Sequence, residues 1–258
     1  MRIATWNMRN GGRPEAWRYV EEQLCPDVAL LQEANPRHRL HPGWAPIDER
    51  RRWGSLVVAR DGLRASPVTA VKGSAMKSPV SGQALSQTYP GAVYVAQIQP
   101  AGSEPLIFVS VYVVQEDNVA QTVVHRVLSD LFPLLTDVRY KDRIVLGGDL
   151  NVSTQLGGMW ARHSKSALDR ITSAYGLINL TDGLRQREAR LRGCPCRDEV
   201  CGHVRTRRSS NSPVPWQTDY LFVSAKLKKR VAHVEIPGDD DAAYAFSDHA
   251  PLIAHLQL

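Results

Sequence analysis

The sequence predicts an α/β fold in which two mixed β-sheets are flanked by helices. Short apolar runs rich in β-branched or aromatic residues recur between glycines and prolines, which is typical of strands. Three longer stretches, one opened by a proline and one stopped by a glycine, are expected to be helices. No short-period repeat and no linker divides the chain. We therefore expect one catalytic domain over residues 1–258, with a Cys/His- and Arg-rich insertion at about 185–215.

The elements follow from the local sequence. Along the chain, the expected strands span residues 2–6, 28–31, 55–59, 92–97, 106–114, 144–147, 220–223, 231–236 and 252–256. The expected helices span residues 14–24, 119–136 and 165–175. Pro14 suits a first helical turn, because the missing N–H has no intrahelical partner there, and Gly176 suits a helix end. Residues 185–215 are expected to be irregular.

The composition is that of an ordinary globular protein, with 43% hydrophobic and 22% charged residues. A chain of 258 residues can bury about three quarters of its unfolded surface. The N-terminal MRIATWN has no apolar signal segment, and no apolar run approaches the roughly 18 residues of a membrane span. Three of the four cysteines lie within eight residues, unlike the disulfide framework of a secreted domain. We expect a soluble cytoplasmic protein that binds no membrane.

Basic residues outnumber acidic ones, which favours a polyanionic partner. The formal net charge is +6 and the isoelectric point is about 9.3. Eight arginines stand against three acidic residues between Arg185 and Arg208. Smaller basic clusters at 50–52 and 226–230 are equally typical of solvated surfaces.

The run IVLGGDLN at residues 144–151 predicts a buried strand that ends in a functional edge. Gly147 and Gly148 allow a backbone or a substrate to approach closely. Asp149 and Asn151 are two apart, so on an extended segment they point to the same side. The first is an anionic acceptor and a possible base, and the second can hold a phosphate oxygen or a water. Alone, this motif is equally compatible with an ordinary strand-to-turn junction.

Further polar residues follow or precede the other predicted strands. Taken singly, each is compatible with a turn or a cap. Together they indicate a site where strand ends converge, and they are Asn7, Glu33, Tyr112, Asp149, Asn151, Asp219, Asp248 and His249.

This set and its order resemble the endonuclease/exonuclease/phosphatase superfamily, which has the DNase I-like fold. The matching stretches are TWN at 5–7, PDVALLQE at 26–33, GGDLN at 147–151, TDYLFVS at 218–224 and SDHAPL at 247–252. They span nearly the whole chain in the order of the family. The resemblance implies a four-layer α/β/β/α sandwich of two mixed sheets flanked by helices, with the active site where the strand ends of the two sheets meet.

The resemblance also implies roles for these residues. Glu33, with Asn7 and Asp248 beside it, is expected to bind Mg²⁺ or Mn²⁺, since such hard cations take oxygen ligands. Asp219 and His249 are expected to pair, which fixes the imidazole tautomer and favours its protonated form. Members of the family differ in whether the histidine or the central aspartate activates water. In the hypothesis that we favour, Asp149 and Asn151 orient the attacking water, while His249 and Tyr112 contact the phosphate.

The chain departs from AP endonucleases of this superfamily in two places. Arg9 stands where they carry an acid, and Trp216 is the only aromatic residue in the segment 203–219, where they are rich in aromatic residues. The stretch PWQTDY is also only loosely similar to the tryptophan motif of inositol phosphatases. The residues expected to contact the substrate are Arg9, Arg205, Arg207 and Arg208.

The stretch GCPCRDEVCGH at 193–203 could bind a structural zinc ion. Cys194, Cys196, Cys201 and His203 make up a Cys₃His ligand set, although the gaps within each pair are shorter than usual. Redox-inert loop cysteines and a regulatory thiol site are the alternatives.

These observations together predict a Mg²⁺-dependent phosphodiester hydrolase, a nuclease that cleaves DNA or RNA. One alternative is a phosphatase or phosphodiesterase that acts on a small or lipid-linked phosphate. A second is a non-catalytic nucleic-acid-binding module, against which the full set of strand-end residues argues. The sequence does not distinguish DNA from RNA or internal from terminal cleavage, and it does not indicate an oligomeric state.

Overall fold

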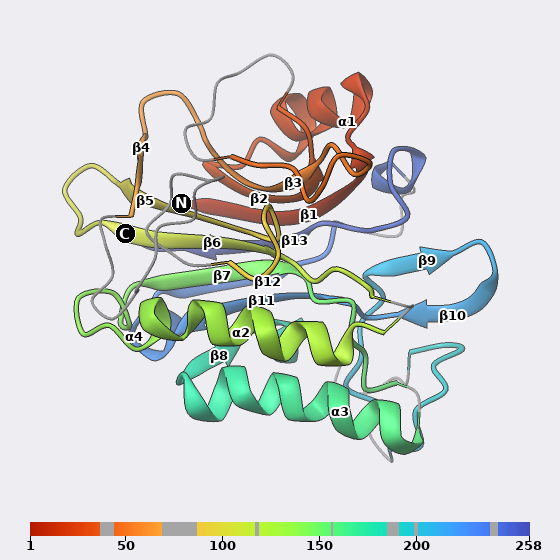
Figure 1. Ribbon diagram of the computed structural model, residues 1–258. Coiled ribbons are helices and arrows are strands. Elements are labelled where there is room, and N and C mark those ends of the chain that lie inside the picture. Colours follow the sequence, from red (N-terminus) through yellow and green to blue (C-terminus); the bar gives the residue numbers. More distant parts are fainter. Residues whose placement is uncertain are drawn as a thin grey trace.

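Two β-sheets pack face to face and helices cover their outer faces, as the sequence predicts (Figure 1). The computed structural model describes residues 1–36, 44–68, 87–116, 119–155, 157–184, 191–198, 201–237 and 242–258. In Figure 1, α1 lies above the first sheet, and α2 and α3 lie below the second. This arrangement confirms the predicted four-layer sandwich.

The first sheet has five strands in the order β12-β13-β1-β2-β3. Their bounds are β1 (Arg2–Gly11), β2 (Val28–Ala34), β3 (Gly54–Ala59), β12 (Val231–Glu235) and β13 (Leu252–Leu256). β1 and β2 run parallel, and Asn7 pairs with Gln32. The carboxyl ends of these two strands therefore meet at one edge of the sheet.

The second sheet has six strands in the order β4-β5-β6-β7-β11-β8. Their bounds are β4 (Arg64–Pro67), β5 (Val93–Gln99), β6 (Leu106–Tyr112), β7 (Ile144–Asp149), β8 (Leu177–Asn179) and β11 (Asp219–Ser224). β6 and β7 are parallel, with Tyr112 beside Asp149. β11 is antiparallel to β7 and places Asp219, its first residue, opposite Asp149. The sheet register thus aligns three polar residues in one row at the same edge.

The helices pack on this framework through apolar faces. α1 (Pro14–Arg18) continues as a π-helical turn, η1 (Tyr19–Leu24), and α3 (Gly158–Asp169) continues as η2 (Arg170–Ala174). α2 (Gln121–Leu135) buries one valine- and leucine-rich face. The shorter elements are η3 (Leu180–Leu184), α4 (Ala225–Lys228) and η4 (Ala243–Ala245). No helix in the described ranges is long and apolar enough to cross a membrane.

Strand β6 shows how the two cores form. Side chains alternate across a strand, so Ile107 and Val109 face the cluster that includes α2, whereas Phe108 faces the cluster between the sheets. Ser110 also faces the inter-sheet side, where its Oγ donates to Leu31 O at 2.8 Å and accepts from Gln32 Nε2 at 2.9 Å. The polar pair is satisfied although it is buried, as a core position requires.

Two sequence-based expectations were wrong. The helix expected at 165–175 begins at Gly158. Its first turns expose Met159 and Trp160, so the apolar residues there do not follow a helical period. The segment expected to be irregular contains a hairpin of β9 (Arg207–Ser209) and β10 (Ser212–Trp216). The prolines of β10 conceal the strand, but a two-stranded ribbon tolerates them because each strand is paired on one side only.

Strands β4 and β8 were not predicted at all. Both are short and lie at the two edges of the second sheet. Edge strands bury fewer side chains, so their sequences carry a weaker apolar pattern.

Candidate active site

The strand ends of both sheets open onto one cavity of about 190 Å³. Its lining residues are Arg9, Asn10, Glu33, Tyr112, Gln115, Asp149, Asn151, Arg207, Asp248 and His249. A larger cavity of about 800 Å³ lies elsewhere, beside Arg143 and Arg230. The smaller cavity is the better candidate, because the polar strand-end residues gather around it.

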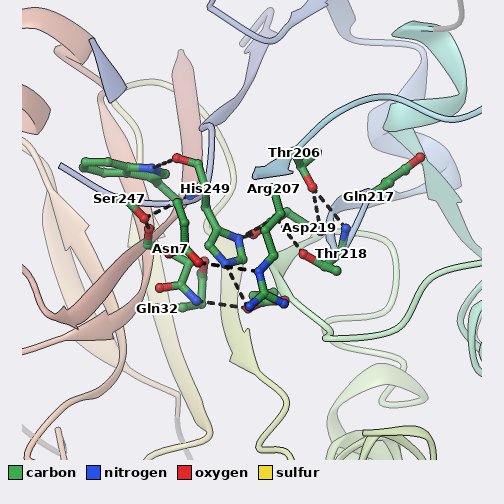
Figure 2. A network of polar contacts seen from close by, with 12 residues as sticks. Asn7, Gln32, Thr206, Arg207, Gln217, Thr218, Asp219, Ser247 and His249 are labelled. Atoms are coloured by element: carbon green, nitrogen blue, oxygen red, sulfur yellow. Dashed lines mark hydrogen bonds and ion pairs between the residues drawn. The ribbon is translucent and has the colours of Figure 1, made fainter. Parts of the chain in front are cut away.

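Asp219 and His249 form a buried pair behind this cavity (Figure 2). His249 Nδ1 lies 2.8 Å from Asp219 Oδ2 and 3.0 Å from Oδ1, and Nε2 lies 3.7 Å from Asp149 Oδ2. The contact to Asp219 places a proton on Nδ1 and turns Nε2 towards the cavity. Burial alone lowers the pKa of His249, but the carboxylates of Asp219 and Asp149 outweigh it and raise the pKa to about 9. The imidazole is therefore a cation at neutral pH.

Asp219 is held in place by hydrogen bonds that involve Thr206 and Thr218. The backbone N–H of Asp219 and that of Thr218 both donate to Thr206 Oγ1 at 3.1 Å. Thr218 Oγ1 donates to Asp219 Oδ2 at 3.1 Å. Thr206 itself is fully buried. These contacts fix the carboxylate that orients the imidazole.

Asp149 is at the centre of the row formed by the sheet register. Its Oδ2 accepts from Asn7 Nδ2 at 3.0 Å, and its Oδ1 accepts from the backbone N–H of Asn151 at 2.9 Å. Burial raises the pKa of Asp149, the charge of His249 lowers it in part, and the carboxylate of Asp219 raises it again. A carboxylate with a raised pKa is a stronger base than an exposed aspartate, which suits it to accept a proton from water.

Glu33 lies across the cavity, at the end of β2. Its backbone has a positive φ of 48°, so a local bend turns the side chain into the site. Oε1 accepts from Asn7 Nδ2 at 3.1 Å, and Oε2 accepts from the backbone N–H of Asn10 at 2.7 Å. Asn7 thus joins Glu33 to Asp149 from behind rather than lining the cavity itself.

Tyr112 and Asn151 contribute neutral polar groups. Burial raises the pKa of Tyr112, and the charges of Glu33 and Asp149 raise it further, so the hydroxyl keeps its proton. Asn151 has a φ of 50°; its Nδ2 donates to Val113 O and its Oδ1 accepts from Gln115 Nε2, both at 2.9 Å. Asn151 is thus held by two hydrogen bonds, and the Tyr112 ring packs edge-on against Trp53, with 5.1 Å between the ring centroids.

Asp248 lies between two arginines. Its carboxylate is 3.6 Å from Arg9 Nε on one side and 3.6 Å from Arg207 Nε on the other. Arg208 and Arg205 do not line the cavity; the guanidinium of Arg208 stacks on the Tyr244 ring at 3.8 Å. Of the four arginines expected to contact a substrate, the structure brings Arg9 and Arg207 to the cavity.

The cavity offers the ligands that a hard divalent cation prefers. The carboxylates of Glu33, Asp149 and Asp248 face an open space together with the amide of Asn151. Asp149, Asp219 and His249 also place one ligand atom each within 4.8 Å of one another. The donor set therefore fits Mg²⁺ or Mn²⁺. Glu33 and Asp248 are the more accessible ligands, because Asp149 and Asp219 are fully buried and already hydrogen-bonded.

Sequence reasoning missed several supporting residues. Gln115 holds Asn151, Asn10 holds Glu33, and Thr206 holds Asp219. Ser247 links the two ends of the chain, because its Oγ donates to Asn7 O at 2.7 Å and accepts from the His249 N–H at 3.1 Å. Ser247 was visible within SDHAPL, whereas no local pattern marks the other three.

The predicted zinc ligands also come together, away from this cavity. Cys194, Cys196, Cys201 and His203 place one ligand atom each within 4.8 Å of one another. Three of the four are buried, and none of the cysteines forms a disulfide.

Two mixed sheets between helices, with an Asp–His pair and a ring of carboxylates and amides at one shared edge, place the protein in the DNase I-like class of α/β sandwiches. The profile of the endonuclease/exonuclease/phosphatase family matches residues 4–249. The chain belongs to this family, whose members hydrolyse phosphoric esters and typically depend on a divalent metal. A sequence comparison with curated proteins found no match.

Solved structures share this fold over the whole chain. The AP endonuclease of Leishmania major superposes with a TM-score of 0.65 at 17% identity, covering 100% of this chain and 87% of the other. A 3′-5′ exonuclease from Neisseria meningitidis gives 0.57 at 18% identity, with 100% of both chains covered. The endonuclease domain of TRAS1, a telomere-specific non-LTR retrotransposon, gives 0.61 at 13%, with 100% and 98% covered. At these identities the likeness establishes the fold alone.

Proposed function

We propose that the protein is a Mg²⁺- or Mn²⁺-dependent phosphodiester hydrolase, a nuclease that cleaves DNA or RNA. The observation that carries this proposal is the charged His249, held by Asp219 and directed at a cavity that Asp149, Glu33 and Arg207 line. The cavity combines a base, cationic groups for a phosphate and ligands for a metal, which are the components of phosphate ester hydrolysis.

The roles follow from the geometry. Asp149 and Asn151 orient a water, and Asp149 accepts its proton as the water oxygen attacks phosphorus. His249 and Tyr112 donate hydrogen bonds to the phosphoryl oxygens, on which negative charge accumulates. A metal ion, when bound by Glu33 and Asp248, supplies positive charge that offsets the charge on the leaving oxygen.

A polymeric substrate is supported by the surroundings of the cavity. The β9–β10 hairpin projects beyond the sheet edge on the side of the site and begins at Arg207 (Figure 1). Arg205 and Arg208 lie on the same segment, and the chain as a whole carries a formal charge of +6. A basic segment that adjoins the cavity suits the successive phosphates of a nucleic acid.

The test is an assay of purified protein on plasmid DNA, single-stranded DNA, RNA and a phosphomonoester, each with Mg²⁺ and with a chelator. We expect cleavage of at least one polymer, and its loss with chelator. Glu33→Ala and His249→Ala should each lower turnover by about a hundredfold or more, because each removes stabilisation of developing charge.

Glu104→Ala and His163→Ala are matched controls, because both residues are exposed and lie outside the cavity. Both controls should keep full turnover and the thermal midpoint of the parent within a few degrees, and Glu33→Ala and His249→Ala should remain folded. Hydrolysis of the phosphomonoester alone would favour a phosphatase instead. Near-normal turnover of Glu33→Ala or His249→Ala would refute the assigned roles.

A further inference from the structure

We propose that Cys194, Cys196, Cys201 and His203 bind one structural zinc ion, and that this ion fixes the segment that carries Arg207 into the active site. The first part is independent of the proposed nuclease activity. The second part rests on the proposed function, because it assigns Arg207 to the substrate phosphate.

The distances between the ligand atoms fit a tetrahedral zinc site. With Zn–S near 2.3 Å and Zn–N near 2.05 Å, the S···N edge of a regular tetrahedron is about 3.6 Å. His203 Nδ1 lies 3.6 Å from Cys194 Sγ and 3.8 Å from Cys201 Sγ. The four ligand atoms all lie within 4.8 Å of one another. The four groups already surround a point at which a single ion can be bound.

The orientation of His203 is that of a metal ligand. Its Nδ1 faces the sulfur atoms, while Nε2 lies 2.8 Å from Thr154 Oγ1. A histidine that binds a metal through one nitrogen usually carries its proton on the other and donates it to a protein oxygen. Thr154 is placed to accept that proton. It comes three residues after Asn151, so the zinc site is joined directly to the loop that follows β7.

The segment around the cysteines has no apolar core that could hold it. Cys194, Cys196 and Cys201 are its buried hydrophobic side chains, at 7%, 4% and 6% exposure, and only Leu191 packs against them among the described hydrophobic residues. Described residues 191–198 and 201–206 form no helix or strand. A short segment without a core or disulfides needs another cross-link to stay folded, and a metal ion supplies one.

A polar network connects the zinc site to the active site. Gln155 is fully buried; its Nε2 donates to Cys194 Sγ at 3.4 Å and to Pro215 O at 2.6 Å, and its Oε1 accepts from Gln217 N at 2.6 Å. Gln217 Oε1 in turn accepts from Val204 N at 3.1 Å. The network therefore holds the cysteine segment, β10 and the start of β11 together.

Arg207 follows at the end of this network. Thr206 receives the N–H groups of Thr218 and Asp219, and its own carbonyl accepts from Ala250 N at 2.7 Å. Arg207 forms an antiparallel bridge with His249, and its side chain reaches the cavity beside Asp219 (Figure 2). Arg207 Nε is buried without a hydrogen-bond partner, 3.6 Å from Asp248. The side chain as a whole is about one third exposed and lines the cavity, so its guanidinium can contact a phosphate there.

The first experiment measures metal content. Protein purified without added metal should carry close to one zinc per chain by elemental analysis. Replacement by Co²⁺ should give the visible absorption of tetrahedral cobalt together with sulfur-to-cobalt charge transfer. Metal-free protein with free thiols, a disulfide among these cysteines, or iron in place of zinc would overturn the proposal. None of these readouts depends on nuclease activity.

The second experiment uses variants. Cys201→Ser should lose the zinc, and Cys25→Ser is its matched control, since Cys25 is exposed and remote from the cluster. Thr154→Val covers the case in which Cys201→Ser fails to fold, because it keeps all four ligands. It should bind zinc about 10- to 100-fold more weakly in competition with a chelator. Unchanged zinc affinity in Thr154→Val would contradict the assigned orientation of His203.

The third experiment tests the link to Arg207. In Thr154→Val stripped of zinc and supplied with Mg²⁺, the apparent KM for a nucleic acid should rise at least tenfold, and zinc should restore it. Arg207→Ala should show the raised KM with zinc present, and stripping should raise it little further. An equal response to stripping in both variants would refute the link. Zinc content measured on the same samples separates that result from a failure of the zinc site, and an inactive parent enzyme would refute the proposed function instead.

Discussion

Asp219→Asn tests the electrostatic argument at the active site. Asparagine has the shape of aspartate, and its Oδ1 can still accept from His249 Nδ1, so the change removes charge while keeping the geometry. The pKa of His249 is raised to about 9 because two carboxylates outweigh burial. Without Asp219, burial remains, opposed only by the carboxylates of Asp149 and, with a smaller effect, Asp248. The pKa of His249 should therefore fall.

The size of the shift follows from the contact. Two opposite charges about 4 Å apart interact by about 4 kcal/mol at an effective dielectric constant near 20, which corresponds to about 3 pKa units. The pKa of His249 should then drop from about 9 to about 6. At pH 7.5 the protonated fraction would fall about thirtyfold, whereas at pH 5.5 it would fall less than twofold.

The sign of the effect is fixed by the direction of the shift. Because its pKa is raised, His249 stays protonated below about pH 9. The parent should therefore lose activity as the pH rises through about 9. In Asp219→Asn this alkaline decline should move towards neutral pH. A loss of orientation would instead lower activity by the same factor at every pH.

The assay combines pH–rate profiles with NMR titration of ¹⁵N-labelled histidine in metal-free protein. Asp142→Asn is the matched control, because this half-exposed carboxylate pairs with Lys226 at 2.8 Å, outside the cavity. It should leave the profile and the His249 titration unchanged. A pKa of His249 that stays near 9 in Asp219→Asn would refute the reasoning.

Two further predictions address packing and substrate binding. Gly148→Ala should destabilise the fold by about 3 kcal/mol or more in urea unfolding, because a Cβ there would lie 1.8 Å from Val111 O. The control Gly157→Ala, with open space around it, should cost under about 1 kcal/mol. Equal stabilities of the two variants would contradict this prediction. Arg207→Ala should flatten the dependence of log affinity on log salt by about one unit for a nucleic acid. Arg64→Ala, at the far end of the second sheet, should not change the slope, and a full slope in both would remove Arg207 from the interface.

The sequence was sufficient to predict the sheets where burial is continuous. Residues 252–256 were predicted as a strand and form β13 with the same bounds, because every residue there except His255 is buried in a core. β1 extends further than predicted, to Gly11. Its last residues adopt positive φ angles at Arg9, Asn10 and Gly11, and a polar segment of this kind carries no strand pattern. Element existence thus follows from burial, whereas the bent ends that shape the site do not.

The sequence likewise predicted which residues make up the candidate site but not the contacts that orient them. Residues at strand ends could be collected from the sequence, because parallel and antiparallel register brings such ends to one edge. The contacts that orient them could not, since they join segments far apart in the chain, as in Ser247 with Asn7. The two arginines beside Asp248 show the same limit. Their place in the cavity depends on the bend after β1 and on the β9 bridge to His249.

The net charge of the cavity explains why binding of the proposed phosphodiester substrate should require a metal ion. Among the described residues in and behind the cavity, four carboxylates stand against three cations, namely Glu33, Asp149, Asp219 and Asp248 against Arg9, Arg207 and His249. The formal charge is therefore about −1 when all four carboxyl groups are ionised and His249 is protonated. Such a site repels a phosphate on its own, whereas one bound divalent cation makes it about +1, which matches the single negative charge of a phosphodiester. The loss of cleavage expected with a chelator thus has two physical sources, since the metal both offsets charge at the leaving oxygen and allows the anionic substrate to enter.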